Sequence, residues 1–356
     1  MKKIIENFSH HFDDYECMWN GIEDIYMKKT GEKLPSQFFF AMSGFCSFAY
    51  IKTNKSDIKR MVSFGDGRTK QMYKFLAPIV NFDYHFIESK TPGLALKKAK
   101  KEIDNDYPVV IGALDMYYLD YFEKIYHKEH IPFHYFLMVG YDDEKEKVYF
   151  YDCGRKELMN ISYNNLYLAM SASYKGLSKP NTICTIRMDK PTCKKEIFIK
   201  SMKIKSEQFL NPQTSFLGVN GIKKLAEEII KWENLLGKED TKKILKNFVE
   251  FCGTVPTTPN ILKGIDKKDD VVFACSRDKM SNVLIEIGNE YNNANIKKAG
   301  NLFSESGKCF EKLCDIFIDY LLDKRNDINI SSEILLNIAD IEFRAYELIN
   351  NGIKEL

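Results

Sequence analysis

The stretch that decides the fold is PFHYFLMVGYDDEKEKVYFYD, residues 132–152. Within it, HYFLMVGYD (134–142) and KVYFYD (147–152) are rich in aromatic and aliphatic residues, and the charged turn DEKE separates them. Residues of these types pack well on a pleated, half-buried surface. The pattern predicts two strands joined as an antiparallel hairpin.

The segments on either side of this hairpin carry a mixture of strand and helix signals. Short apolar runs predict further strands at 108–115 (PVVIGALD) and 182–188 (TICTIRM). Near the start, Asp13 and Asp14 are candidate helix caps before apolar residues at helical spacing, and Gly31 stands at a plausible stop. A second helix is predicted over 93–103, with a lysine-rich face that we interpret as solvated.

Beyond a lysine-rich connector at about 189–200, the helical period takes over. GVNGIKKLAEEIIKWENLL (218–236) is strongly amphipathic, and several later segments repeat that pattern without a fixed repeat length. The sequence therefore predicts an α+β fold in two domains, residues 1–195 with mixed elements and residues 196–356 mostly helical.

Composition excludes several classes of protein. The 356 residues carry 52 basic and 50 acidic side chains, so the net charge of +2 argues against a nucleic-acid binder. No window approaches the roughly 18 apolar residues of a membrane span, and the first residues lack a signal-peptide core. Nine scattered cysteines without a CxxC pair favour reduced thiols, a cytoplasmic location and no structural zinc.

Three residues form a candidate nucleophilic site: Cys17, His134 and Asp152. Acyl transfer needs a nucleophile, a base and a group that orients the base. Cys17 stands where the first helix begins, and a helix N-terminus favours the thiolate. His134 opens the first strand of the hairpin and Asp152 ends the second.

The register of the hairpin decides whether His134 and Asp152 meet. If Tyr141 pairs with Val148, Asp152 lies opposite Leu137, a diagonal near miss. A bulge or a different register closes this gap, and the sequence leaves both open. Each residue also has an ordinary structural explanation: an inert buried thiol, a surface histidine, and an aspartate of turn chemistry.

The order and placement of these residues resemble the papain-like cysteine peptidase fold. More closely, the first 190 residues resemble the N-terminal domain of the butirosin biosynthesis protein H family, related to C39-type peptidases. The resemblance rests on the Cys17 helix, on AMSGFCSFAY (41–50) and most strongly on 108–152, and it continues in the later segment FLGVNGIKKLAEEIIKW (216–232), so that it covers most of the chain.

This resemblance implies an acyltransferase of specialised-metabolite (antibiotic) biosynthesis. Members of that family take an acyl group from a carrier-protein thioester to an amine, such as an aminoglycoside, and the enzyme of closthioamide assembly does the same with a diamine. Carried over, Cys17 accepts the acyl group, His134 moves the proton and Asp152 orients His134. The acyl donor is the phosphopantetheine arm of a carrier protein, with no bound cofactor and no metal.

Three further residues are secondary candidates. His11 lies six residues before Cys17, where papain-like enzymes carry an oxyanion donor, although a surface His-His pair explains it equally well. Asp115, with Tyr117 beside it, could bind the positive charge of the amine, or it could accept backbone hydrogen bonds.

Two other functions remain open from the sequence. One is a cysteine peptidase or amidohydrolase with the same triad, and the other is a non-catalytic binding module of the same fold. The helical domain could close over the pocket, recognise the acceptor or form a homodimer.

Overall fold

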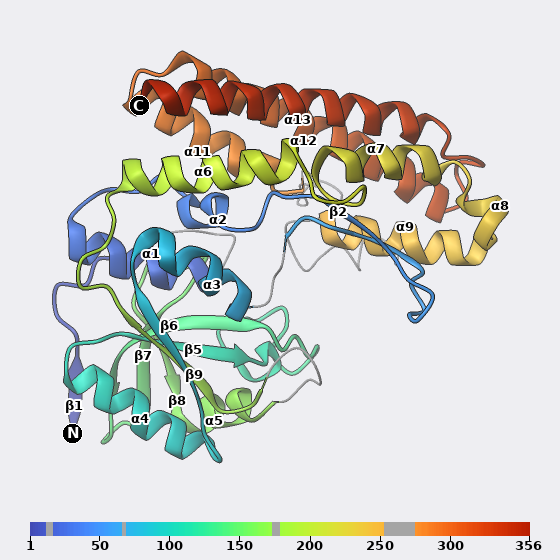
Figure 1. Ribbon diagram of the computed structural model, residues 1–356. Helices are drawn as coiled ribbons and strands as arrows, with labels where there is room; N and C mark the ends of the chain where they lie inside the picture. Colours follow the sequence, from blue (N-terminus) through green and yellow to red (C-terminus); the bar gives the residue numbers. More distant parts are fainter. Residues whose placement is uncertain (12–16, 66–68, 173–178, 253–274) are drawn as a thin grey trace. The chain divides into compact units, whose positions relative to one another are not determined.

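The computed structural model divides the chain into two compact units (Figure 1). The first unit comprises Met1–Phe39 and Arg68–Lys194, and the second comprises Phe40–Gly67 and Lys195–Leu356. The structure describes residues 1–11, 17–65, 69–172, 179–252 and 275–356. The predicted α+β class is confirmed, because the first unit contains a large sheet and the second is mostly helical.

The first unit is built on a seven-stranded sheet in which all neighbouring strands run antiparallel. The strand order is β4-β9-β5-β6-β7-β8, with β1 also pairing with β6. The strands are β1 (Lys2–Ile4), β4 (Asp83–Glu88), β5 (Val109–Leu114), β6 (His134–Asp142), β7 (Lys147–Tyr151), β8 (Met159–Ser162) and β9 (Thr182–Arg187).

The predicted hairpin is the β6–β7 pair, and the predicted strands at 108–115 and 182–188 are β5 and β9. The burial of β5 and β6 agrees with their central place in the sheet. Every residue of β5 is buried, and nearly every residue of β6 is buried too. Strands buried on both faces need cover on both sides of a sheet.

Helices supply that cover. They are α1 (Cys17–Thr30), α3 (Thr69–Val80), α4 (Pro92–Asp104), α5 (Tyr163–Ser171) and the short 3₁₀ helix η1 (Met116–Tyr118). α1 packs against β6, and Gly21 permits the close approach. A Cβ on Gly21 would lie 3.2 Å from Val110 and 3.3 Å from Leu137. Gly31, with φ of 73°, ends α1 as predicted. The candidate caps Asp13 and Asp14 lie outside the described residues.

The second unit is a helical body with one hairpin. Its elements are β2 (Ala49–Lys52), β3 (Arg60–Ser63), α6 (Lys194–Leu210), α7 (Gly218–Ile229), α8 (Trp232–Leu236), α9 (Lys238–Cys252), α11 (Arg277–Glu290), α12 (Ala294–Leu321) and α13 (Ile330–Glu355). The short helix α2 (Phe38–Met42) spans the division between the units. The amphipathic stretch 218–236 is two helices, α7 and α8, rather than one.

The segment 40–67 joins the second unit through hydrogen bonds with α7 and its surroundings. The N–H of Tyr50 donates to the carbonyl of Phe216 at 2.8 Å, and the N–H of Gly218 donates to that of Phe48 at 2.9 Å. The hydroxyl of Tyr50 donates to Glu228 at 2.8 Å. The predicted domain boundary at 195 places 40–67 in the first domain, whereas the contacts group this segment with the helices.

A buried ion pair ties three helices of the second unit together. Arg277 of α11 and Glu342 of α13 are both fully buried, with Nε–Oε1 at 2.7 Å and Nη2–Oε2 at 3.0 Å. Ser306 of α12 donates to the same carboxylate at 2.6 Å. Such a bidentate pair is strongly oriented. Within the described ranges, none of the helices is both long and apolar enough to span a membrane.

Candidate active site

A bulge in the β6–β7 hairpin brings His134 and Asp152 together. Tyr141 pairs with Val148, as the sequence analysis supposed, but the register shifts between Met138 and Gly140. Because β6 has one extra residue there, Leu137 pairs with Tyr151 instead of Asp152. Asp152, the residue after Tyr151, therefore lies one pairing position closer to His134. The Nε2 of His134 lies 2.7 Å from Oδ2 of Asp152.

The environment of this pair is dry. His134 is 5% exposed and Asp152 is 1% exposed. The hydroxyl of Tyr121 donates to the same Oδ2 at 2.8 Å, and Phe122 packs edge-to-face on the imidazole at 4.9 Å between ring centres. Oδ1 of Asp152 has no hydrogen-bond partner among the described residues. A carboxylate with two donors on one oxygen fixes the orientation of the imidazole.

Cys17 is the first residue of α1 and interacts with this pair. A hydrogen bond from the thiol of Cys153 is the largest contribution to the lowered pKa of Cys17. Together with the charge and hydrogen bond of His134, it lowers the pKa of Cys17 from 9.0 to about 5, against the effects of burial and of Asp152. The first turn of α1 carries no acidic residue to oppose the thiolate.

The ionisation of His134 complements that of Cys17. Burial disfavours the imidazolium, but the charges of Asp152 and Cys17 and their hydrogen bonds raise the pKa of His134 to about 10. Since Nε2 faces Asp152, Nδ1 is the nitrogen left for the sulfur. Between these two pKa values the site holds a thiolate and an imidazolium. This arrangement provides a nucleophile and a proton donor at neutral pH.

His11 lies against carboxylates of α1. Its backbone N–H donates to Asp24, and its ring Nε2 lies 3.3 Å from Oε2 of Glu23. Burial and the neighbouring His10 lower the pKa of His11. The side chain is 16% exposed, so the surface explanation does not describe it. No contact in the described part of the chain joins His11 to Cys17, and its oxyanion role stays a prediction.

Asp115 is buried and accepts several hydrogen bonds. The N–H groups of Tyr117 and Ile131 both donate to Oδ1 at 3.1 Å, and Nδ1 of His130 lies 2.6 Å from Oδ2. This geometry matches the structural alternative, in which the aspartate accepts backbone hydrogen bonds and caps η1. Tyr117 is half-buried and stacks on His130 with ring centres 4.1 Å apart. A substrate-binding role for Asp115 and Tyr117 stays a prediction.

The sequence reasoning missed two residues of this site. Neither Cys153 nor Tyr121 was singled out as a candidate. Their signals were modest: Cys153 directly follows the candidate aspartate, and Tyr121 lies within the aromatic-rich stretch 117–122. Across the described ranges, no cluster of three or more His, Cys, Asp or Glu side chains is arranged to hold a metal ion.

Comparison with known families addresses the segment that contains this geometry. Residues 16–153 match the family model "Butirosin biosynthesis protein H, N-terminal". The matched segment includes Cys17, His134, Asp152 and Cys153, so the predicted family resemblance is confirmed for this part of the chain. The family's name links it to the biosynthesis of butirosin. No curated protein matches the chain.

Proposed function

We propose that this protein is a cysteine-dependent acyltransferase that moves an acyl group from a carrier-protein thioester to an amine, forming an amide. The geometry that supports the proposal is the placement of Cys17 at the start of α1 beside His134, whose Nε2 lies 2.7 Å from Oδ2 of Asp152, together with the lowered pKa of Cys17 and the raised pKa of His134. The match of residues 16–153 to a butirosin-biosynthesis family supports synthesis over peptide hydrolysis.

In the first half-reaction, the Cys17 thiolate attacks the thioester carbonyl of the acyl-phosphopantetheine arm. The tetrahedral oxyanion collapses, the pantetheine sulfur leaves, and the imidazolium of His134 protonates that sulfur. The products are an S-acyl enzyme, a free carrier thiol and neutral His134. A thioester is already activated, so the protein's main contributions are position and charge.

In the second half-reaction, the amine attacks the S-acyl carbonyl. Neutral His134 takes the proton that the attacking nitrogen loses, and the Cys17 thiolate leaves. The thiolate–imidazolium pair is then restored, and the product is an amide. Excluding water while the acyl enzyme waits decides between amide formation and hydrolysis.

Backbone N–H groups at the start of α1 are proposed donors to the oxyanion, with His11 as a second candidate. Asp115 and Tyr117 remain the proposed contacts of the amine. The proposal includes a carrier protein and a small amine as partners, and no bound cofactor. It also includes a cytoplasmic location, which nine scattered cysteines without a CxxC pair fit, and a homodimer formed by the second unit.

The test begins with intact-mass measurement after incubation with an acyl-pantetheine thioester. We expect a stable acyl adduct on the wild-type protein and none on Cys17→Ala. Cys184→Ala, which removes a buried thiol in β9 of the same unit, is the matched control and keeps the adduct. Adding a panel of diamines and aminoglycosides then releases the acyl group as an amide.

Two results would redirect the proposal. Cleavage of peptides with no amide product would favour the peptidase alternative, and an adduct that persists in Cys17→Ala would exclude Cys17 as the nucleophile. A wild-type protein that never acquires an adduct, with either thioesters or peptides, would favour a binding module.

A further inference from the structure

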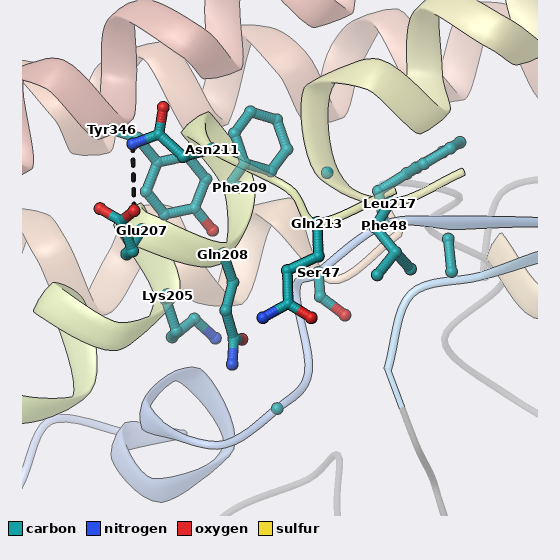
Figure 2. Close-up of a pocket in the computed structure, with 13 residues that line it drawn as sticks. Ser47, Phe48, Lys205, Glu207, Gln208, Phe209, Asn211, Gln213, Leu217 and Tyr346 are labelled. Atoms are coloured by element: carbon teal, nitrogen blue, oxygen red, sulfur yellow. Dashed lines mark hydrogen bonds between the residues drawn. The ribbon is translucent and has the colours of Figure 1, made fainter. Parts of the chain in front are cut away.

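The second unit contains a pocket that the proposed chemistry does not use. Its volume is about 510 Å³, within the range of about 300–1,000 Å³ typical of small-molecule sites. Three parts of the second unit form it: the segment 44–49, the end of α6 with the loop that leads into α7, and Tyr346 of α13. Figure 2 shows these lining side chains.

The inner wall of the pocket is apolar. Phe48, Phe209 and Tyr346 are 3% exposed or less. The rings of Phe209 and Tyr346 stack with their centres 4.6 Å apart. Such a wall favours the flat or aliphatic body of an organic molecule over a purely polar solute.

Lys205 lies at this wall, and its buried charge has no counter-anion among the residues that the structure describes. The residue is 5% exposed, and its ammonium donates to the carbonyl of Ser43 at 2.7 Å and to that of Phe45. No carboxylate in the described part of the chain forms an ion pair with it. The neighbouring buried cation, Arg277, is already paired with Glu342.

A lysine has three N–H donors, and the two carbonyls occupy two of them. These two carbonyls therefore leave one donor and the positive charge unused, and Lys205 is one of the residues that line the pocket. Burial lowers the pKa of Lys205 to about 8, so the ammonium form still predominates at neutral pH. Buried charges in proteins are normally paired, which makes this ammonium a natural anchor for an anion.

The rim of the pocket sets the kind of anion. Gln208 and Gln213, on α6 and the following loop, offer exposed amides, while Asn211 donates to the carboxylate of Glu207 at 3.2 Å. A carboxylate at the rim repels a polyanion such as a phosphate ester more than it repels a single negative charge. One buried cation also balances one charge, not two.

From these features we propose that the second unit binds a small organic carboxylate, with the carboxylate on Lys205, the apolar body against Phe48 and Phe209, and polar substituents at the amide rim. This site is independent of the Cys17 chemistry and does not rest on the proposed function.

The test measures the binding of four probes to the full chain by ¹⁹F NMR and calorimetry. The probes are 4-fluorobenzoate, neutral 4-fluorobenzamide, cationic 4-fluorobenzylamine and, as a competitor, inorganic phosphate. We expect saturable binding of the benzoate, binding at least about tenfold weaker for the amide and the amine, and no displacement by phosphate.

Two variants locate the site. Lys205→Met removes the charge and should weaken benzoate binding at least about tenfold, whereas Lys203→Met, on an exposed position of the same helix, leaves it unchanged. Gly44→Leu keeps Lys205 but fills the pocket, because a Cβ at this lining residue meets no atom of the described ranges within 4 Å. It should abolish binding while the circular dichroism spectrum stays native.

The proposal is overturned if the benzoate shows no saturable binding to the wild type. It is also overturned if folded Lys205→Met and Gly44→Leu both bind as the wild type does, or if the amide binds as tightly as the benzoate. Should Lys205→Met fail to fold, the Gly44→Leu result and the comparison of charged and neutral probes decide the question.

Discussion

Replacing Cys153 by alanine should make Cys17 harder to ionise. The hydrogen bond from the Cys153 thiol is the largest contribution to the lowered pKa of Cys17. A hydrogen bond to a charged group contributes about 1.5–3 kcal/mol, and about 1.4 kcal/mol corresponds to one pKa unit. The substitution should therefore raise the pKa of Cys17 from about 5 to about 6–7.

The size of the effect at neutral pH follows from this change. With a pKa of about 5, about 99% of Cys17 is thiolate at pH 7, compared with about 1% for a thiol with a pKa of 9.0. In Cys153→Ala the thiolate fraction at pH 7 should fall to about 50–90%. The pKa of Cys17 rises because the Cys153 S–H stabilises the thiolate, and the methyl group of alanine cannot.

The assay follows alkylation of Cys17 by iodoacetamide across a pH series, with the product quantified by peptide mass spectrometry. Because the thiolate is the reactive species, the rate rises through the pKa of the thiol. Cys193→Ala, which removes an exposed thiol in the same unit, is the matched control and should leave the profile of Cys17 unchanged. His134→Ala should move the onset upward as well, since the imidazolium also favours the thiolate.

Two outcomes would refute this reasoning. An unchanged onset in Cys153→Ala would mean that the Cys153 thiol does not donate a hydrogen bond to Cys17. A wild-type onset near the ordinary value for cysteine would mean that the thiolate–imidazolium pair does not form at neutral pH, and the proposed chemistry would lose its main support.

Three further substitutions test contacts within each unit. Tyr121→Phe removes a donor from the buried carboxylate of Asp152 and should lower the unfolding free energy by about 1.5–3 kcal/mol in urea denaturation; an unchanged midpoint would contradict the hydrogen bond. Arg277→Met leaves the buried carboxylate of Glu342 unpaired and should lower the unfolding free energy by about 3–5 kcal/mol. The double variant with Glu342→Leu should recover much of this loss in the same assay. Gly112→Ala places a Cβ 2.3 Å from Cδ1 of Tyr135 in β6 and should lower the melting temperature in calorimetry. An unchanged melting temperature would show that β6 can shift to make room for the methyl group without loss of stability.

The central part of the first unit was predictable because its signals are local. The run 132–152 alternates and turns like a hairpin, and the structure forms β6 and β7 there. The helix that starts at Cys17 and stops at Gly31 was readable from spacing and from the need for a positive φ. The strand β4 (Asp83–Glu88) was missed, since its pairing with β9 depends on residues about a hundred positions away.

The grouping of 40–67 with the helical unit could not be read from the sequence. Its attachment consists of backbone and side-chain hydrogen bonds between Tyr50 or Phe48 and partners near residues 216–232. Such long-range pairings leave no periodic trace in the chain. The break between α7 and α8 was equally invisible, because the apolar spacing continues through it.

For the candidate site, the sequence by itself determined the residue types and their order: a cysteine at a helix start, a histidine that opens a strand and an aspartate that ends the next. The tertiary structure decided whether they meet. A one-residue bulge between Met138 and Gly140 brings Asp152 within 2.7 Å of His134. Folding also adds the thiol of Cys153 to Cys17. The physical reason is that periodicity reports which face a side chain occupies, whereas register and ionisation depend on neighbours that only the folded chain supplies.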